Sequence, residues 1–115
     1  MANTFKLITK AAVTSADVIY TVAGSTTTII LGLLIGNTTS SAITSSVTLG
    51  TDTTSRAGNN DEANQSVELI TSAAIPANSS LELMAGNKIV METTDTLSVT
   101  GSGAVDVTLS IMEMT

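Results

Sequence analysis

Stretches rich in threonine, valine and isoleucine recur along this chain, and they restrict its fold more than any other feature. β-Branched side chains suit the pleated, half-buried surface of a sheet and lose rotamer freedom in a helix. The clearest pattern is a strict alternation of apolar and polar residues near the end of the chain, and no segment shows a helical period. In that alternation one face carries Val105, Val107, Leu109 and Ile111.

Turn residues divide the chain at intervals of roughly ten to fifteen residues, which is the spacing of an all-β sandwich or barrel. Examples are residues 23–25, 36–37 and 101–103, and Pro76 lies where a turn enters the next strand. The 115 residues are enough for one domain. We therefore predict a single-domain antiparallel β-sandwich over residues 1–115, jelly-roll-like or immunoglobulin-like, with about eight strands.

Two segments are apolar on both faces of the predicted strand. Residues 28–35 are expected to form either a central strand of the sandwich or a strand buried at a subunit contact, with residues 29–35 contributing to the core. At the end of the chain, Met112 and Met114 lie on the face opposite Ile111. They either fill the core or form a soft, adaptable contact surface for a partner.

The first strand is predicted at residues 4–10, with Phe5 and Leu7 opposite Lys6 and Ile8. The core should be thin, because the chain has one Phe, one Tyr and no Trp, and aromatic rings supply much of the buried area in small domains. Association with another subunit would add stability by coupling folding to assembly. We therefore predict a homo-oligomer.

The composition argues against several classes of function. Without His or Cys, the commonest general bases, nucleophiles and thiolate ligands are missing. A formal charge of −6 with four scattered basic residues offers no phosphate-binding surface, so we expect no nucleic-acid partner. The longest apolar run is about seven residues, against about twenty for a spanning helix, and no signal-peptide pattern begins the chain. We predict no enzymatic activity, no metal, no cofactor and no membrane partner.

One long polar segment, residues 51–65, lacks strand character and contains Arg56, Asp61 and Glu62. Loops of this length are uncommon in compact domains and are often functional when ordered. Two interpretations stay open: a mobile surface loop, or an arm ordered against a neighbouring subunit through these three residues. Asp61 and Glu62 could also supply oxygen ligands to calcium, but EF-hand spacing is absent and solvated acids are the simpler interpretation.

Three segments together resemble a known group of proteins: residues 19–33, residues 75–81 and residues 107–113. They are similar to small virion structural proteins of tailed phages, especially phages of marine bacteria and cyanobacteria. Members of that group tend to carry a Tyr-Thr-Val-Pro-Ala-Gly-Thr-Thr turn followed by an apolar strand. This chain departs at Ala23, where proline is common, and at Asn87 and Lys88, which replace an Asp step.

The resemblance implies a virion protein made in the host cytoplasm, a β-sandwich that is often oligomeric and bound to capsid or tail. The expected function is a capsid decoration (cement) protein that lies on the outside of the head as an oligomer, with a trimer as the expected number, and stabilises the shell. The expected partner is the major capsid protein or another virion protein. Alternatives are a neck, tail or fibre-associated protein, a host-surface glycan-binding module, and a hydrolase using lone carboxylates. The predicted interface residues are Arg56, Asp61, Glu62, Met112 and Met114.

Overall fold

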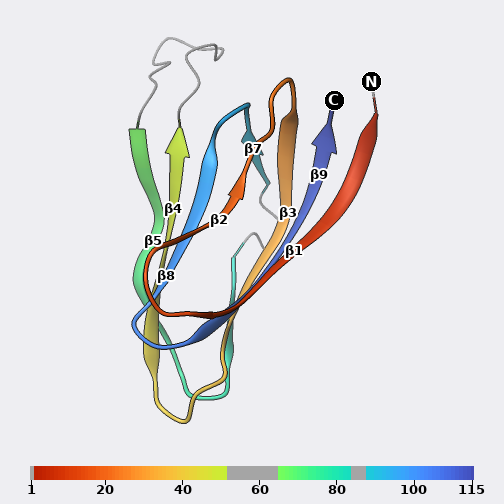
Figure 1. Ribbon diagram of the computed structural model, residues 1–115. Helices are drawn as coiled ribbons and strands as arrows, with labels where there is room; N and C mark the ends of the chain where they lie inside the picture. Colours follow the sequence, from red (N-terminus) through yellow and green to blue (C-terminus); the bar gives the residue numbers. More distant parts are fainter. Residues whose placement is uncertain (1, 52–64, 84–87) are drawn as a thin grey trace.

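Two antiparallel sheets face each other in the computed structural model of the protein, which describes residues 2–51, 65–83 and 88–115 (Figure 1). The described residues form nine strands and no helix, so the predicted all-β sandwich is confirmed. The strands are β1 (Asn3–Val13), β2 (Asp17–Thr21), β3 (Thr27–Asn37), β4 (Ile43–Thr51), β5 (Gln65–Ile75), β6 (Ser80–Glu82), β7 (Ile89–Met91), β8 (Thr96–Gly101) and β9 (Val105–Met114).

The strand order is that of a jelly roll. The five-stranded sheet has the order β1-β9-β3-β6, with β7 also on β3, and the four-stranded sheet has the order β2-β8-β4-β5. β6 and β7 share one position, because they pair with residues 34–36 and 28–30 of β3. The pairs β1·β9, β2·β8, β3·β6/β7 and β4·β5 form a long antiparallel ribbon wrapped into two sheets. The immunoglobulin-like alternative is wrong. In an immunoglobulin fold the first two strands lie in the same sheet, whereas β1 and β2 of this protein lie in different sheets.

Aliphatic side chains fill the space between the sheets. The largest contribution comes from Ile30, Leu33 and Ile35 of β3 and from Leu109 and Ile111 of β9, each at most 1% exposed. Phe5 is 71% exposed, so its ring lies outside the core, and the buried hydrophobic residues are all aliphatic or methionine, as predicted. The remaining buried hydrophobic residues are Val13, Val22, Val47, Ile75, Met91, Leu97, Val99, Val105 and Val107.

A β-bulge explains why β3 is apolar on both faces. Ile30 pairs with Ile111 of β9 but Gly32 pairs with Ser110, so Leu31 is an extra residue in β3. Because of this extra residue, both Ile30 and Leu33 point into the core. β3 is a central strand, lying between β9 and β6/β7, as predicted. Its outward-facing residues are half-buried, or exposed in the case of Leu34, so the prediction that all of residues 29–35 belong to the core is wrong for them.

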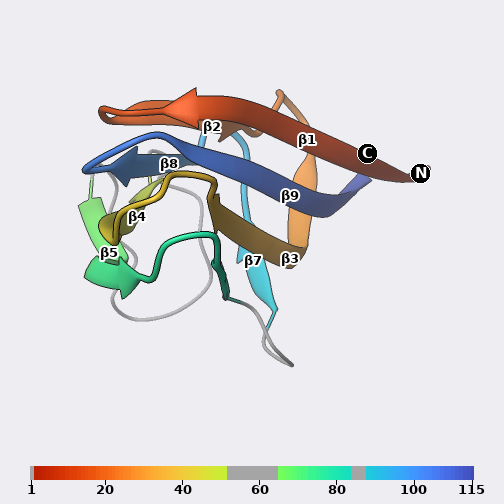
Figure 2. The same ribbon diagram turned by 90° about the horizontal axis from the view of Figure 1, so that it is seen from below.

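β1 is the edge strand of the five-stranded sheet, and it is longer than the predicted residues 4–10. It lies beyond β9 in both views of the ribbon (Figures 1 and 2). Over Asn3 to Lys10 it pairs with β9 in an unbroken register. Lys6 and Ile8 pair with residues of β9 that face the core, so Phe5 and Leu7 point to the outer face.

β4 and β5 form a hairpin that takes in both ends of the predicted polar loop. Thr51 and Gln65 are paired strand residues, so the connection is shorter than predicted and comprises residues 52–64. Arg56, Asp61 and Glu62 lie in that connection, outside the described residues. Their predicted contacts with a neighbour stay a prediction.

Candidate interaction surface

A row of apolar side chains crosses the outer face of the five-stranded sheet. Phe5 of β1 pairs with Met112 of β9, Met112 pairs with Ile29 of β3, and Ile29 pairs with Val90 of β7. Directly paired residues point to the same face of a sheet, so the four side chains form one line across it. Phe5 is 71% and Val90 is 58% exposed, while the two middle residues are half-buried. We call this line the apolar row.

A second line of paired residues lies beside the apolar row on the same outer face and ends at a shallow hollow. Leu7, which is 66% exposed, pairs with Ser110, and Ser110 pairs with Gly32 at the bulge of β3. A Cβ atom added to Gly32 would meet nothing within 4 Å, so the surface is open at this point. The hollow measures about 250 Å³, and its lining residues are Gly32, Leu33, Leu34, Glu82, Thr108 and Ser110.

The two predicted methionines belong to this same outer face. Met112 lies in the apolar row, and Met114 lies one pair further along, between Asn3 of β1 and Thr27 of β3. Both are half-buried, whereas Ile111, which precedes Met112 on the chain and points to the other face, is fully buried. The methionines therefore lie on the surface of the sheet and not in the core, and their role as an interface stays a prediction. The structure gives no position relative to them for Arg56, Asp61 and Glu62, which lie outside the described residues.

Directly behind the apolar row, a polar cluster joins the two sheets at one end of the sandwich. Glu113 of β9 accepts hydrogen bonds from the Tyr20 hydroxyl of β2 and from Lys6, whose Nζ lies 2.7 Å from its Oε1. The Tyr20 hydroxyl also lies 2.7 Å from Thr28 Oγ1 of β3. The Glu113 side chain is 12% exposed. A nearly buried carboxylate is tolerated here because both of its oxygens are hydrogen-bonded.

The protonation states of this cluster suit a structural contact. Hydrogen bonds from Lys6 and Tyr20 lower the pKa of Glu113, so it is ionised at neutral pH. Burial, reinforced by the hydrogen bond to Glu113, raises the pKa of Tyr20 to about 12, so its hydroxyl stays protonated. A tyrosine with a raised pKa is a poor proton donor at neutral pH, and a carboxylate with a lowered pKa is a weak base. The cluster therefore links β1, β2, β3 and β9 through hydrogen bonds and an ion pair.

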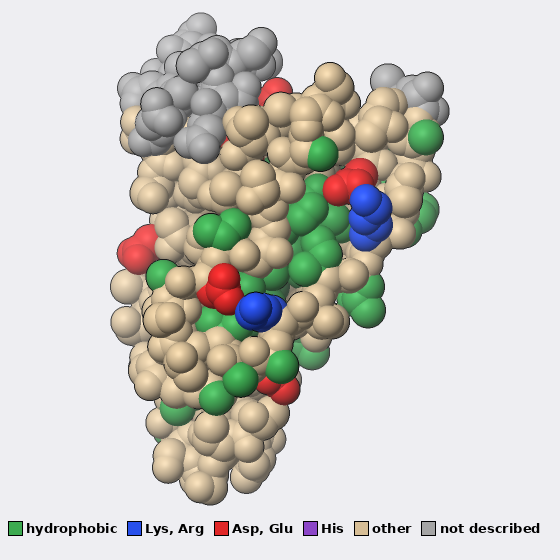
Figure 3. Space-filling model, viewed as in Figure 1, with side chains coloured by type: hydrophobic (Ala, Val, Ile, Leu, Met, Phe, Trp, Pro, Cys, Tyr) green, Lys and Arg blue, Asp and Glu red, His purple; other side chains and the backbone are tan. Residues whose placement is uncertain are grey.

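A second ion pair lies on the same side of the molecule. Lys10 of β1 lies 3.7 Å from Asp17 of β2, so each lysine of β1 is paired with an acid of its own chain. Figure 3 shows two places at which a basic side chain lies next to an acidic one, with hydrophobic side chains exposed between the two places. The face of β1 that points toward the sandwich is therefore neutralised within the chain.

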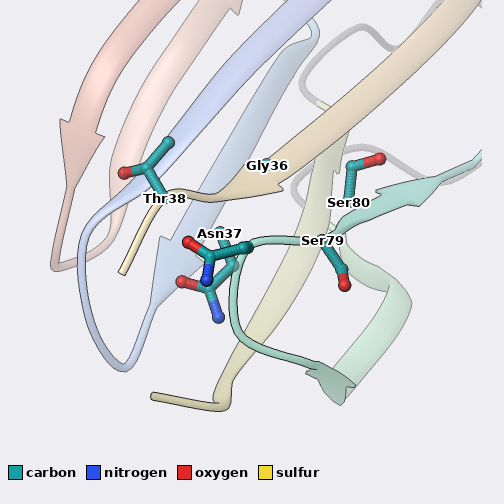
Figure 4. Close-up of a pocket in the computed structure, with 6 residues that line it drawn as sticks. Gly36, Asn37, Thr38, Ser79 and Ser80 are labelled. Carbon is teal, nitrogen blue, oxygen red and sulfur yellow. The ribbon is translucent and has the colours of Figure 1, made fainter. Parts of the chain in front are cut away.

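A larger hollow of about 430 Å³ lies where the β3–β4 turn meets the β5–β6 turn (Figure 4). Asn37, at the end of β3, is 2% exposed, and its Nδ2 donates to the carbonyl oxygens of Ser41, Ile75 and Pro76. Its Oδ1 accepts hydrogen bonds from the backbone N–H and the hydroxyl of Thr39. Asn37, which was predicted in a turn, thus ends the strand and fastens two turns together. Its amide has no capacity left for a ligand.

Other kinds of site receive no support from the described residues. Within residues 2–51, 65–83 and 88–115, no three His, Cys, Asp or Glu side chains come together in a way that could hold a metal ion. The same ranges contain no helix of the length and apolarity that a bilayer crossing requires.

Sequence reasoning missed most of the residues that form the outer face. Phe5, Leu7 and Ile29 were recognised as apolar strand residues, but alternation alone does not show which face of a strand is buried. Val90 stands in a strand of only three residues. The lysines of β1 indicate which of its faces points inward, because Lys6 contacts Glu113 from the inner face. These two residues are more than a hundred positions apart in the sequence, so their contact can be recognised only once the fold is known.

No protein-family model, no curated protein and no solved structure matches the chain.

Proposed function

We propose that the protein is a phage virion structural protein, a capsid decoration (cement) protein that binds the shell through the outer face of its five-stranded sheet. The observation that carries the proposal is the apolar row of Phe5, Met112, Ile29 and Val90, on a sheet face that no described strand covers. Contiguous exposed apolar surface of this kind is typical of sites that contact another protein.

Two further observations support the proposal. The segments around Tyr20, Pro76 and Leu109 resemble small virion proteins of tailed phages, as described above. The jelly-roll arrangement occurs in viral capsid domains, but also in lectin domains and cupins, so the fold is compatible with the proposal without selecting it.

The proposed mechanism is burial of apolar surface on the shell. Burying a side chain such as Phe5 or Val90 contributes about 1.5–3 kcal/mol, part of which is offset by the cost of ordering and association. Met112 and Met114 can adapt their shape to an irregular surface, because the thioether chain is unbranched and polarisable. The partner is the major capsid protein or another virion protein that presents a complementary apolar surface, and the protein binds as a homo-oligomer.

The test is binding of the purified protein to empty phage heads, combined with the melting temperature of the heads. The wild-type protein is expected to bind and to raise that temperature. Val90→Lys places a charge at the end of the apolar row and should weaken binding at least about tenfold, since an unpaired buried charge costs several kcal/mol. Val67→Lys is the matched control, because Val67 is 48% exposed on β5 of the other sheet and should bind as the wild type does.

Three results would redirect the proposal. Equal binding by Val90→Lys and the wild type would remove the outer face as the contact. Binding to tails or necks in place of heads would identify the protein as a neck, tail or fibre component. Binding to glycans with no binding to virion parts would identify a host-surface binding module.

A further inference from the structure

We infer that β1 is the oligomerisation edge of this protein, and that two copies pair β1 with β1 in antiparallel fashion about a two-fold axis at Leu7. The inference does not depend on the proposed function, because it concerns the purified protein alone. It rests on a comparison of the four sheet edges, on the charges of β1, and on the register that self-pairing allows.

β1 is the most accessible edge among the described strands. Over Asn3 to Lys10 it is exposed on both faces except at Ile8, which is half-buried, and its one pairing partner in the sheet is β9. A regular edge strand presents unpaired N–H and C=O groups that can pair with another strand. A long exposed edge therefore requires either protection or a partner.

The other edges are short or irregular. β6 and β7 have three residues each, and β2 has five residues with a register shift against β8. β5 is as long as β1, but two register shifts interrupt its pairing with β4, and Ser72 within it has a φ of 49°. Short, bulged and kinked strands pair poorly with a second chain. β1 keeps eight consecutive residues in one register, from Asn3 to Lys10.

The usual charge protection of an edge strand is reduced in β1. Edge strands commonly carry lysines that repel a second strand. Lys6 is bound to Glu113 and Lys10 lies beside Asp17, so each lysine has an acidic partner within the chain, and repulsion matters only in registers that place two lysines directly opposite each other. The outward-facing residues of this segment, Asn3, Phe5, Leu7 and Thr9, carry no charge at all.

Self-pairing selects one register. A two-fold axis perpendicular to the sheet keeps the outer faces of both copies on one side. An axis at Lys6 would place the two Lys6 side chains opposite each other, and an axis at Ile8 would place Lys6 opposite Lys10. Like charges directly opposite are destabilising. An axis at Leu7 places Leu7 opposite Leu7, Phe5 opposite Thr9, and Lys6 opposite Ile8. The pairing then runs from Thr4 to Lys10, which is all of the regular segment except Asn3.

The second copy is therefore the occupant that fits this edge. The paired strands would join the two five-stranded sheets into one, with Phe5 and Leu7 of both copies side by side on its outer face. This arrangement predicts a two-fold dimer instead of the trimer that was expected from the sequence.

The test uses the absence of cysteine from the chain. Leu7→Cys should form a disulfide-linked dimer under mild oxidation, because directly paired residues have Cβ atoms about 4.5–5.5 Å apart. Thr9→Cys is the control on the same strand and face. The two Thr9 residues would be separated by four residues, roughly 14 Å along the strand at 3.4 Å per residue. That exceeds the roughly 7 Å between Cα atoms that a disulfide tolerates.

A second arm measures the dimer without a covalent link. Sedimentation equilibrium of the wild type should give twice the 11.6 kDa chain mass. Leu7→Lys and Leu7→Glu should each weaken the dimer at least about tenfold, and an equal mixture of the two should restore it, because only a Leu7–Leu7 contact pairs the opposite charges. A monomeric or trimeric wild type, equal cross-linking of Leu7→Cys and Thr9→Cys, or failure of the mixture to restore dimers would overturn the inference.

Discussion

The hydroxyl of Tyr20 donates a hydrogen bond to Glu113 across the gap between the two sheets. Tyr20 belongs to β2 and Glu113 to β9, so this contact joins the four-stranded sheet to the five-stranded sheet. It lies at the end of the sandwich where the aliphatic core gives way to polar side chains, Thr28 among them. At this end of the sandwich, charge-assisted hydrogen bonds therefore join the two sheets in place of apolar packing.

Removing the Tyr20 hydroxyl should destabilise the protein. Tyr20→Phe deletes the donor to Glu113 and leaves a nearly buried carboxylate with one partner fewer, which costs about 1–3 kcal/mol. Chemical denaturation measures the change in the free energy of unfolding. Thr71→Val is the control, because it removes a hydroxyl that donates to an exposed carboxylate, Glu68, and should cost well under about 1 kcal/mol. Equal losses in both variants would contradict the importance of the buried bond.

Acid should weaken the same contact. Lys6 and Tyr20 lower the pKa of Glu113 below its ordinary value of 4.5, so the unfolded chain takes up this proton first as the pH falls. The stability that Glu113 contributes is therefore complete above 4.5 and is lost as the pH falls through its folded pKa. Denaturation curves from neutral to acidic pH should show this loss in the wild type. Glu113→Gln cannot titrate there, and its stability should be lower at neutral pH and depend less on pH; two parallel profiles would refute the assignment.

Alkaline titration reports the cluster directly, because the chain has one tyrosine. The ultraviolet absorbance of tyrosinate should appear with a midpoint at about 12 in the folded protein, against 10.0 for a free side chain. Since the folded pKa is the higher one, the stability contributed by Tyr20 is complete below 10.0 and is lost as the pH rises through about 12. In Glu113→Gln the midpoint should move down toward the ordinary value. A midpoint near 10.0 in the folded wild type would show that the hydroxyl is neither buried nor held by Glu113 in solution.

Two glycines should respond in opposite ways to the same substitution. A Cβ at Gly101 would lie 2.5 Å from the Gly103 carbonyl oxygen and 2.8 Å from that of Val13, so Gly101→Ala should cost about 1–3 kcal/mol. Gly32→Ala meets open space and should be neutral or stabilise by about 0.5–1 kcal/mol, because alanine restricts the unfolded chain. Denaturant midpoints of the two variants provide the comparison. If Gly32→Ala lost as much stability as Gly101→Ala, the result would contradict the open surface at the bulge.

Alternation of apolar and polar residues was enough to predict the sheet architecture and the orientation of β9. Val107 and Leu109 are buried, and Met112 and Met114 lie on the opposite face, as the period of two requires. The alternation is reliable here because polar residues separate the apolar ones and fix the phase.

The same reasoning could not assign the faces of β1. One face of β1 carries Phe5 and Leu7, whereas the other carries Ile8 with two lysines, so the sequence favours burying the wrong side. The observed orientation depends on Glu113 and Asp17, which accept the two lysines on the inner side. Those partners are brought close by the jelly-roll pairing of β1 with β9 and by the approach of β2, and neither is visible from local sequence.

The bulge at Leu31 and Gly32 has a consequence for changes in chain length. If Leu31 were deleted, Ile30 and Leu33 would keep their inward orientation, because the extra residue alone separates them from regular alternation. A deletion elsewhere in β3 would turn every side chain beyond it to the opposite face. Among the interior positions of β3, the bulge is therefore where the gene can lose one codon while the encoded strand still directs the same side chains inward.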